Sequence, residues 1–330
     1  MMKRLLVLLS VVLGIACARP DGQPPVSVIF DTDMAPDYDD VGAIAVLHAL
    51  ADSGEVQILG TVTSNRTETA VPCIEVLNNY FGRPNLPVGA PKGIAPDLNT
   101  WHRGLRWTEE LPARFRHRTA RTSDAPDAVQ VYRQILSAQP DTSVTIVTVG
   151  FLSNLRDLLA SEPDSLSPLG GRDLVSAKVR KLVSMAGVFP EGKEFNVMCD
   201  SIASAVVFSE WPTPVVLSGF EIGDKVITGA RTATMDAEGN PVRETYAMCL
   251  AQDDPAGRCS WDQTTVLVAV RGAAPYYDTE RGTMTVYPDG SNSWTPSADG
   301  PHERLVARMP SGEVAAIIED MMMHRPPRHK

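Results

Sequence analysis

A β–α–β pattern opens the folded part of the chain and constrains its fold more than any other feature. Val26 to Phe30 is typical of a buried strand, Val41 to Ala51 of an apolar helix, and Val56 to Val62 of a second strand. Apolar strands joined through a helix form parallel sheets with right-handed crossovers. The pattern therefore predicts an α/β protein with an open, mostly parallel, Rossmann-like sheet flanked by helices.

The rest of the chain continues this pattern. We expect further strands over 144–149, 181–186 and 214–217, helices over 200–208, 264–270 and 312–323, and a hairpin over 283–296 around Asp289-Gly290. Residues 90–126 contain several prolines and look irregular, which is typical of a long functional loop. Because no repeat or linker interrupts the chain, we expect a single domain over 26–330.

The N-terminus has the pattern of an export signal. Lys3 and Arg4 precede an apolar run from Leu5 to Ala16 that is too short to span a bilayer. We therefore expect a signal peptide over 1–17 and a polar tether over 18–25. Ala16-Cys17-Ala18 fits ordinary signal peptidase, whereas residues 14–17 resemble a lipobox with Cys17 as the lipidated residue. The expected location is the periplasm, in soluble form or as a membrane-anchored lipoprotein.

The net charge and the cysteines restrict the ligands and cross-links that the chain can have. The formal net charge is −10, so a phosphate backbone would be repelled and nucleic-acid binding is not expected. A small neutral substrate or a cation fits better. Cys249 and Cys259 flank a polar, turn-rich stretch and are candidates for a disulfide, whereas free buried thiols are an equally good interpretation of Cys73 and Cys199. The cysteine spacing does not indicate a zinc site.

An acidic segment joins the first strand to the first helix. Asp31-Thr32-Asp33-Met34-Ala35-Pro36-Asp37-Tyr38-Asp39-Asp40 holds five carboxylates in ten residues. One or two would suffice to cap a helix, and the mutual repulsion of five favours a bound cation. Hard oxygen ligands select calcium or magnesium, and a flexible set that includes carbonyl groups favours calcium.

Two other motifs compete for the same segment. An EF-hand loop beginning at Asp31 fails, because its sixth and twelfth positions are Pro36 and Gly42. A magnesium-dependent phosphatase of the haloacid-dehalogenase type would use Asp31 as nucleophile. That family expects Thr or Val where this chain has Ala35, so the phosphatase is the weaker alternative.

The acidic segment resembles the N-terminal signature of the inosine–uridine-preferring nucleoside hydrolases, in which Asp-x-Asp and a short turn precede Asp-Asp at a helix start. The turn is two residues longer here, since five residues separate Asp33 from Asp39. Four more stretches match the family in order: 61–65, 148–155, 185–196 and Trp261-Asp262 before an apolar helix. The resemblance covers about residues 26–275.

The resemblance implies a calcium-dependent enzyme that hydrolyses the N-glycosidic bond of a ribonucleoside or related N-riboside. It assigns carboxylate ligands of calcium to Asp33, Asp40 and Asp262, and a main-chain carbonyl ligand to Val149. Asp39 would be the general base that deprotonates water. Ribose hydroxyls would be bound by Asn65, Glu194 and Asn196. Asp31 would brace the acidic segment, and Asp37 has no assigned role.

Trp261 departs from the family pattern. Many members have a His at this position, which protonates the departing base, and an indole cannot do so at neutral pH. Trp261 is expected instead to stack on the base or close the pocket, with His102 as a candidate replacement acid. The lost His also leaves open a non-catalytic envelope protein that binds a ribosyl ligand. Relatives are commonly dimers or tetramers, so a homodimer or homotetramer is expected.

Overall fold

A ten-stranded sheet forms the centre of the computed structural model, which describes residues 22–100 and 106–326. Seven neighbouring strands run parallel, in the order β3 (Val88–Gly89), β2 (Val56–Thr63), β1 (Val26–Thr32), β4 (Val144–Thr148), β5 (Val179–Met185), β7 (Val215–Ser218) and β12 (His302–Ala307). Three antiparallel strands extend this sheet, in the order β10 (Tyr277–Val286), β11 (Ser291–Pro296) and β6 (Glu191–Lys193). The predicted fold class is confirmed.

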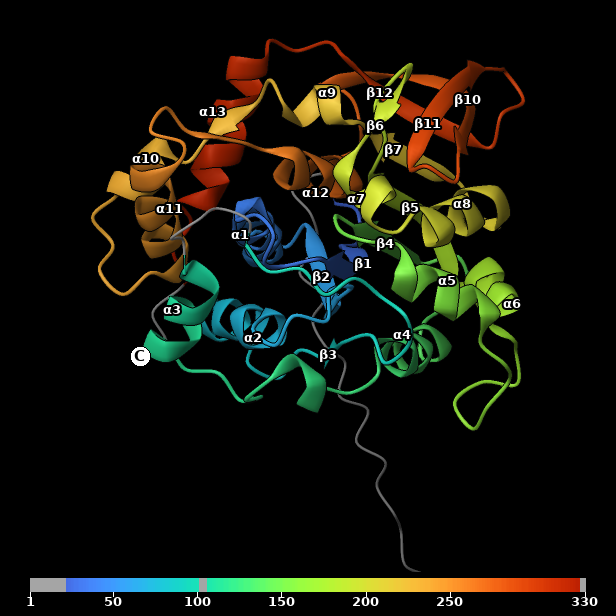
Figure 1. Ribbon diagram of the computed structural model, residues 1–330, viewed down its shortest axis with the longest axis horizontal. Helices are drawn as coiled ribbons and strands as arrows, with labels where there is room; N and C mark the ends of the chain where they lie inside the picture. Colours follow the sequence, from blue (N-terminus) through green and yellow to red (C-terminus); the bar gives the residue numbers. More distant parts are fainter. Residues whose placement is uncertain (1–21, 101–105, 327–330) are drawn as a thin grey trace, which may run out of the picture.

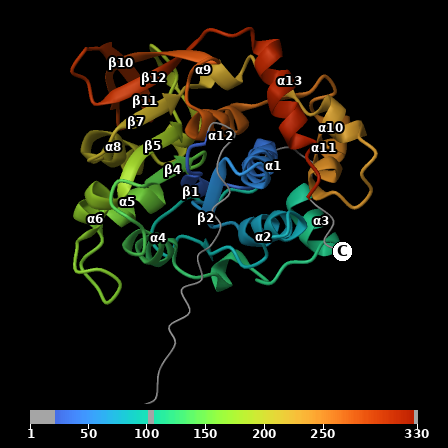
Figure 2. The same cartoon turned by 180° about the vertical axis from the view of Figure 1, so that it is seen from behind.

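Helices cover both faces of the sheet (Figures 1 and 2). One face carries α1 (Asp39–Asp52), α2 (Ala70–Tyr80), α11 (Pro241–Gln252), α12 (Trp261–Arg271) and α13 (Ser311–Met322). The other carries α4 (Ala128–Ser137), α5 (Ser153–Ala160), α6 (Gly171–Lys178) and α8 (Ser201–Glu210). Successive side chains of β1 enter different cores, Val28 and Phe30 on the first face and Ile29 on the second. This explains why the three successive residues at 28–30 are all apolar.

Helix α1 is the centre of the first face. It packs against α2, α12 and α13 as well as β2, and a helix enclosed on all sides is apolar on all sides. Asp39 and Asp40 form the first turn at its N-terminus. The positive end of the helix dipole favours carboxylates there.

Short elements complete the chain between the layers. They are α3 (Trp107–Arg114), α7 (Phe195–Cys199), α9 (Phe220–Gly223), α10 (Ala230–Thr234), β8 (Ile227–Thr228), β9 (Arg258–Cys259) and a 3-10 turn (Thr122–Asp124).

Helix α3 corrects the expectation that 90–126 is wholly irregular. Trp107 at its start is fully buried and fixes the segment to the core. Pro112 lies inside the helix and lacks an N–H, so the carbonyl of Thr108 accepts a hydrogen bond from the Cys73 thiol instead (3.4 Å). A tertiary contact therefore compensates for the proline, which sequence pattern alone does not reveal.

The hairpin over 283–296 is confirmed. Strands β10 and β11 pair antiparallel, and the turn between them has Gly290 at φ +79°. Asp289 accepts a hydrogen bond from the N–H of Ser291 (3.0 Å). Because a positive φ strains residues with a Cβ, the turn requires glycine at this point.

The predictions about the N-terminus and His102 cannot be compared with the structure, whereas the one about the disulfide can. Cys17, the signal region 1–17 and His102 lie outside the described residues. Among the described helices, none is long and apolar enough to span a bilayer. Cys249 and Cys259 are free thiols, so the disulfide alternative is not borne out. Cys249 is fully buried, whereas the Cys259 thiol contacts the carbonyl of Asp224 (3.6 Å).

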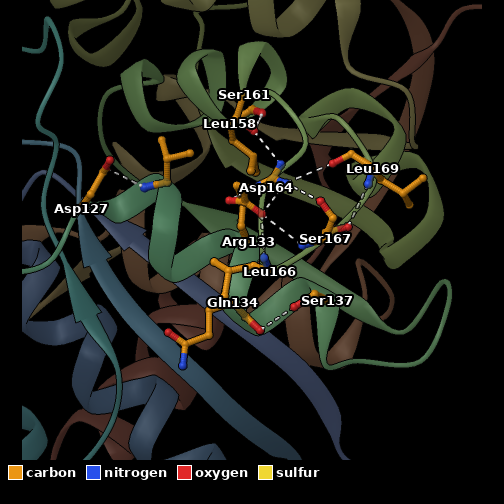
Figure 3. A network of polar contacts seen from close by, with 11 residues as sticks. Asp127, Arg133, Gln134, Ser137, Leu158, Ser161, Asp164, Leu166, Ser167 and Leu169 are labelled. Atoms are coloured by element: carbon orange, nitrogen blue, oxygen red, sulfur yellow. Dashed lines mark hydrogen bonds and ion pairs between the residues drawn. The ribbon is translucent and has the colours of Figure 1, made fainter.

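Arg133 of α4 forms hydrogen bonds with the loop that connects α5 to α6 (Figure 3). Its fully buried guanidinium binds both carboxylate oxygens of Asp164 (2.8 and 2.9 Å) and the Ser161 hydroxyl (2.9 Å). It also donates to the carbonyls of Ser167 (3.2 Å) and Leu169 (3.1 Å). This network holds the C-terminal end of α5, whose N-terminal end faces the acidic segment.

Candidate active site

The acidic segment lies where β1, β4 and two helix N-termini converge. β1 and β4 are paired in parallel, with Asp31 opposite Thr148, so the residues after both strands share one edge of the sheet. Helix α1 begins at Asp39, within the acidic segment, and packs against α12. Ligand sites in open α/β sheets form at this carboxyl edge.

A cavity of about 150 Å³ opens at this edge. Six acidic residues contribute to its lining: Asp33, Asp37, Asp39, Asp40, Glu194 and Asp262. The other lining residues are Pro36, Val149, Met185, Phe195, Asn196, Phe220, Arg258 and Trp261. The lining therefore combines carboxylates with one basic side chain and three aromatic side chains, which we call the aromatic wall: Phe195, Phe220 and Trp261.

Three of the carboxylates form a tight cluster. Oxygen atoms of Asp39, Asp40 and Asp262 lie within 4.8 Å of one another, and each residue is at most 4% exposed. Burial raises the pKa of Asp39, and repulsion from Asp40 raises it further. The pKa of Asp262 is raised for the same two reasons, with Asp39 as its main repelling neighbour. Such a cluster gains stability from a cation.

Backbone and hydroxyl donors hold the cluster. The N–H of Asp262 donates to the Asp39 carboxylate (3.2 Å), which connects the N-termini of α12 and α1. The Thr32 hydroxyl donates to Asp40. These donors fix the orientation of the carboxylates and leave further lone pairs on their oxygens for a ligand.

Asp33 and Val149 lie on the same cavity, outside the three-residue cluster. Burial, followed by repulsion from Asp40 and Asp39, raises the pKa of Asp33. Gly150 makes the approach of the two segments possible, because a Cβ there would lie 2.3 Å from the backbone nitrogen of Asp33. Carboxylates and a main-chain carbonyl are hard oxygen donors, so these residues fit a hard divalent cation.

Glu194 and Asn196 line the cavity from α7. Glu194 caps this helix and accepts hydrogen bonds from the N–H groups of Asn196 (2.7 Å) and Val197 (3.1 Å). Burial raises the pKa of Glu194 to about 7. The side-chain amide of Asn196 donates to the carbonyls of Val149 (3.0 Å) and Met185 (3.3 Å). Both predicted ribose-binding side chains are thus held at the cavity wall.

Asn65 is placed differently from the other predicted ribose-binding residues. It is fully buried, and its amide nitrogen donates to the carbonyls of Asp33 (2.8 Å) and Leu98 (2.6 Å). Its amide oxygen accepts from the N–H groups of Thr67 (3.2 Å) and Leu98 (3.0 Å). All four bonding positions of this amide are filled, so Asn65 supports the acidic segment, and direct ribose binding by it stays a prediction.

Asp31 braces the acidic segment from the opposite face of the sheet. Its carboxylate accepts hydrogen bonds from the Tyr132 hydroxyl in α4 (2.9 Å) and the Asn154 amide in α5 (3.0 Å). Asn154 also donates to the carbonyl of Thr63 (2.8 Å). Burial raises the pKa of Asp31 to about 7. Because this carboxylate bonds to α4 and α5, the geometry does not favour its use as a phosphatase nucleophile.

Trp261 begins α12 and forms part of the aromatic wall. Its indole N–H donates to the carbonyl of Phe220 (2.8 Å), and the two rings lie 5.1 Å apart. Arg258 lies beside Trp261 and forms an ion pair with Asp37. Sequence reasoning missed both Phe220 and Arg258. The pairing of Arg258 with Asp37 joins positions 221 residues apart, and local sequence carries no signal for it.

The geometry defines the class of protein: a parallel α/β protein with a polyanionic, small-molecule cavity at the carboxyl edge of its sheet. The model of the inosine-uridine preferring nucleoside hydrolase family matches residues 28–303, and the chain belongs to this family. The predicted family and the predicted enzyme class, N-glycosyl hydrolase, are both confirmed.

Relatives and solved structures agree with this assignment. The pyrimidine-specific ribonucleoside hydrolase RihB of Escherichia coli K12 is 29% identical over 237 residues, which cover 67% of this chain and 68% of that protein. The inosine-uridine preferring nucleoside hydrolase of Bacillus anthracis has a TM-score of 0.67 at 16% identity, covering 90% of this chain and 99% of that chain. The plant nucleoside hydrolase PpNRh1 has a TM-score of 0.66 at 20% identity, covering 91% and 99%. The structural likenesses show the shared fold.

Proposed function

We propose that this chain hydrolyses the N-glycosidic bond of a ribonucleoside to give ribose and a free base, and that it uses calcium to do so. The observation that carries the proposal is the buried cluster of Asp39, Asp40 and Asp262 on the cavity of a nucleoside hydrolase family member. A phosphatase would need a free nucleophile, which the bonded Asp31 does not offer.

Calcium fits the donor set of the cavity. Asp33, Asp40 and Asp262 would supply carboxylate oxygens, and Val149 would supply its carbonyl. When bound, calcium would supply Lewis acidity and the positive charge that keeps the surrounding carboxylates ionised. All of these donors are oxygens, which a hard cation prefers over nitrogen or sulfur ligands.

Asp39 is the proposed general base. The N–H of Asp262 holds its carboxylate toward the N-terminus of α12, and the residue lines the cavity. There it takes a proton from water as the water oxygen bonds to the anomeric carbon. The bond from that carbon to the base nitrogen breaks, and its electron pair leaves with the base. The charge that develops on the sugar resembles an oxocarbenium ion.

Binding of the two halves of the substrate is divided between the cavity walls. Glu194 and Asn196 take ribose hydroxyls through the lone pairs that their backbone partners leave free. Asn65 contributes through the position of the Asp33 carbonyl. Trp261 and Phe220 face the base, and His102 remains the candidate acid for the departing base.

The test of this function is ribose release from a panel of purine and pyrimidine nucleosides by the wild type and by the Asp39→Asn variant. Asn preserves the acceptor oxygen for the Asp262 N–H, so folding and metal binding are retained while the base is lost. Release by the wild type and its loss in the variant support hydrolysis. Nucleoside binding without any release by the wild type would instead support the ribosyl-binding alternative.

We also propose that the chain is exported through residues 1–17, with Cys17 as an attachment point for lipid. The support is the basic and apolar pattern of the sequence. Labelled palmitate incorporated by the wild type but not by a Cys17→Ser variant would support anchoring. An unlabelled wild-type protein in the periplasmic fraction would support cleavage by ordinary signal peptidase.

A further inference from the structure

The lengthened acidic turn is joined to the start of α12 by Arg258. The guanidinium forms ion pairs with Asp37, in the turn, and with Asp254 (3.2 Å). The Tyr38 hydroxyl donates to the same Asp254 carboxylate (2.8 Å). The Arg258 side chain is 12% exposed, and its two carboxylate partners are 17% and 27% exposed. We call this set of Asp37, Tyr38, Asp254 and Arg258 the arginine clamp.

The arginine clamp also contacts the aromatic wall of the cavity. The central carbon of the Arg258 guanidinium lies 5.2 Å from the Trp261 ring centroid and 5.4 Å from that of Tyr38. Asp37, Arg258 and Trp261 all line the cavity. A planar guanidinium held by two carboxylates offers a fixed face to a neighbouring aromatic ring, which an ammonium group cannot do.

The clamp contains part of the lengthened turn. Asp37 and Tyr38 lie within the lengthened stretch between Asp33 and Asp39. The turn also contains Ala35 at φ +144°, a conformation that strains a residue with a Cβ and persists only where neighbours hold it. Contacts from α12 and the segment before it therefore fix the turn that carries the cavity carboxylates.

We propose that Arg258 is a positioning residue that holds Trp261 against the base of the substrate, with Asp37 as its main partner. This inference rests on the proposed function, because the proposed function is what places the base of the substrate against Trp261. Asp37 and Asp254 balance the charge of Arg258. The guanidinium therefore acts by orienting the Trp261 ring and not by binding a charged ligand. Loss of Arg258 weakens the aromatic contact with the base more than it slows bond breaking.

The test is a comparison of Arg258→Met, Arg258→Lys and Asp37→Asn with the calcium-loaded wild type, using uridine and inosine. We expect KM to rise roughly fivefold in Arg258→Met, as for a lost cation–π contact, with a smaller change in kcat. Arg258→Lys should be intermediate, because it keeps the charge but not the planar fork. The double variant Asp37→Asn/Arg258→Met should have the same KM as Arg258→Met alone, because Asp37 is expected to act through Arg258.

A second readout reports on Trp261 itself. Nucleoside-dependent quenching of tryptophan fluorescence is measured with and without Trp261→Phe, so that the difference belongs to Trp261. Arg258→Met should reduce this difference at saturating nucleoside. If Arg258→Met does not fold, Asp37→Asn keeps the Asp254 contact and gives the same readout. Arg231→Met is the matched control, since its pair with Asp320 (2.8 Å) is 55% and 66% exposed.

The outcomes separate this inference from the proposed function. Wild-type KM and an unchanged Trp261 signal in Arg258→Met would overturn the clamp, whatever the enzyme hydrolyses. A wild type without any nucleoside-dependent Trp261 signal would overturn it as well. A wild type that binds nucleosides through Trp261 but releases no ribose would overturn only the catalytic proposal, and the clamp would be judged on binding.

Discussion

The backbone N–H of Asp262 donates a hydrogen bond of 3.2 Å to the carboxylate of Asp39. The two residues belong to the first turns of α12 and α1, which pack side by side on one face of the sheet. The N-terminal ends of both helix dipoles thus point at the same carboxylate cluster. Two segments far apart in sequence therefore form one anionic site.

Replacement of Asp39 by Asn should lower kcat by about two to four orders of magnitude, as expected for removal of a general base. KM should change little, because the hydrogen bond from Asp262 is retained. Steady-state ribose release measures both constants. Asp236→Asn, at an exposed residue far along the chain, serves as the control and should behave as the wild type. Equal kcat in the two variants would exclude Asp39 as the base.

Calcium should raise the midpoint of thermal unfolding. A cation that binds only the folded state relieves the repulsion among the buried carboxylates, adding about 2.7 kcal/mol at a concentration of one hundred times Kd. Differential scanning calorimetry with calcium or a chelator measures the shift. The Asp262→Asn variant should lose most of it. A calcium-independent midpoint in the wild type would contradict a calcium site in this cavity.

His48 should make stability fall in mild acid. It is fully buried, stacks on Phe81 (4.7 Å), accepts a hydrogen bond from Arg83 (3.3 Å) and donates one to Asn78 (3.0 Å). Burial, followed by the Arg83 charge, lowers the pKa of His48 from 6.5 to about 3. The unfolded chain therefore takes up the proton first. Stability from this residue is complete above pH 6.5 and is lost progressively as the pH falls toward 3.

Urea unfolding at pH 7 and pH 5 measures this loss. The difference in unfolding free energy between the wild type and His48→Gln should change by about 2 kcal/mol between these pH values, at 1.4 kcal/mol per pH unit below 6.5. Parallel pH curves for the wild type and His48→Gln would contradict this account, because they would show that folding does not shift the pKa of His48.

Arg133→Met should destabilise the fold by about 2–3 kcal/mol, because it removes several charge-assisted hydrogen bonds of a buried guanidinium. Arg172→Met is the matched control: its pair with Glu210 (2.6 Å) is 51% exposed on both sides and should contribute less than about 1 kcal/mol. Chemical unfolding measures both. Similar losses in the two variants would show that the network in Figure 3 adds no more than an exposed pair does.

The sequence allowed the fold class and the cavity carboxylates to be predicted for a physical reason. Buried strands are apolar throughout, so the acidic stretch after β1 stands out, and parallel strands bring their carboxyl ends to one edge. Strand β12 was not predicted, because its Glu303 and Arg304 interrupt the apolar pattern of a strand that pairs with β7. Helix α3 was missed because Pro112 argues against a helix in the sequence. The helix forms because the Cys73 thiol of α2 donates to the carbonyl that the proline leaves without a partner.

The residues that line the cavity beside the carboxylates were harder to predict than the carboxylates themselves. Arg258 and Phe220 reach the cavity through tertiary contacts that join distant segments. Asn65 lies next to the acidic segment, but its bonding to the Asp33 and Leu98 carbonyls depends on loop geometry that no motif records. Motifs therefore predicted carboxylates that line the cavity, whereas the contacts that orient these side chains required the structure.

The central claim is that this acidic cavity hydrolyses nucleosides with calcium. The most direct measurement is free ribose released from a nucleoside panel by the purified protein, with calcium and with a chelator followed by calcium restoration. The account predicts release that stops on chelation and returns with calcium. Release that continues at an unchanged rate in the chelator, or no release from any nucleoside by a calcium-saturated protein, would contradict it.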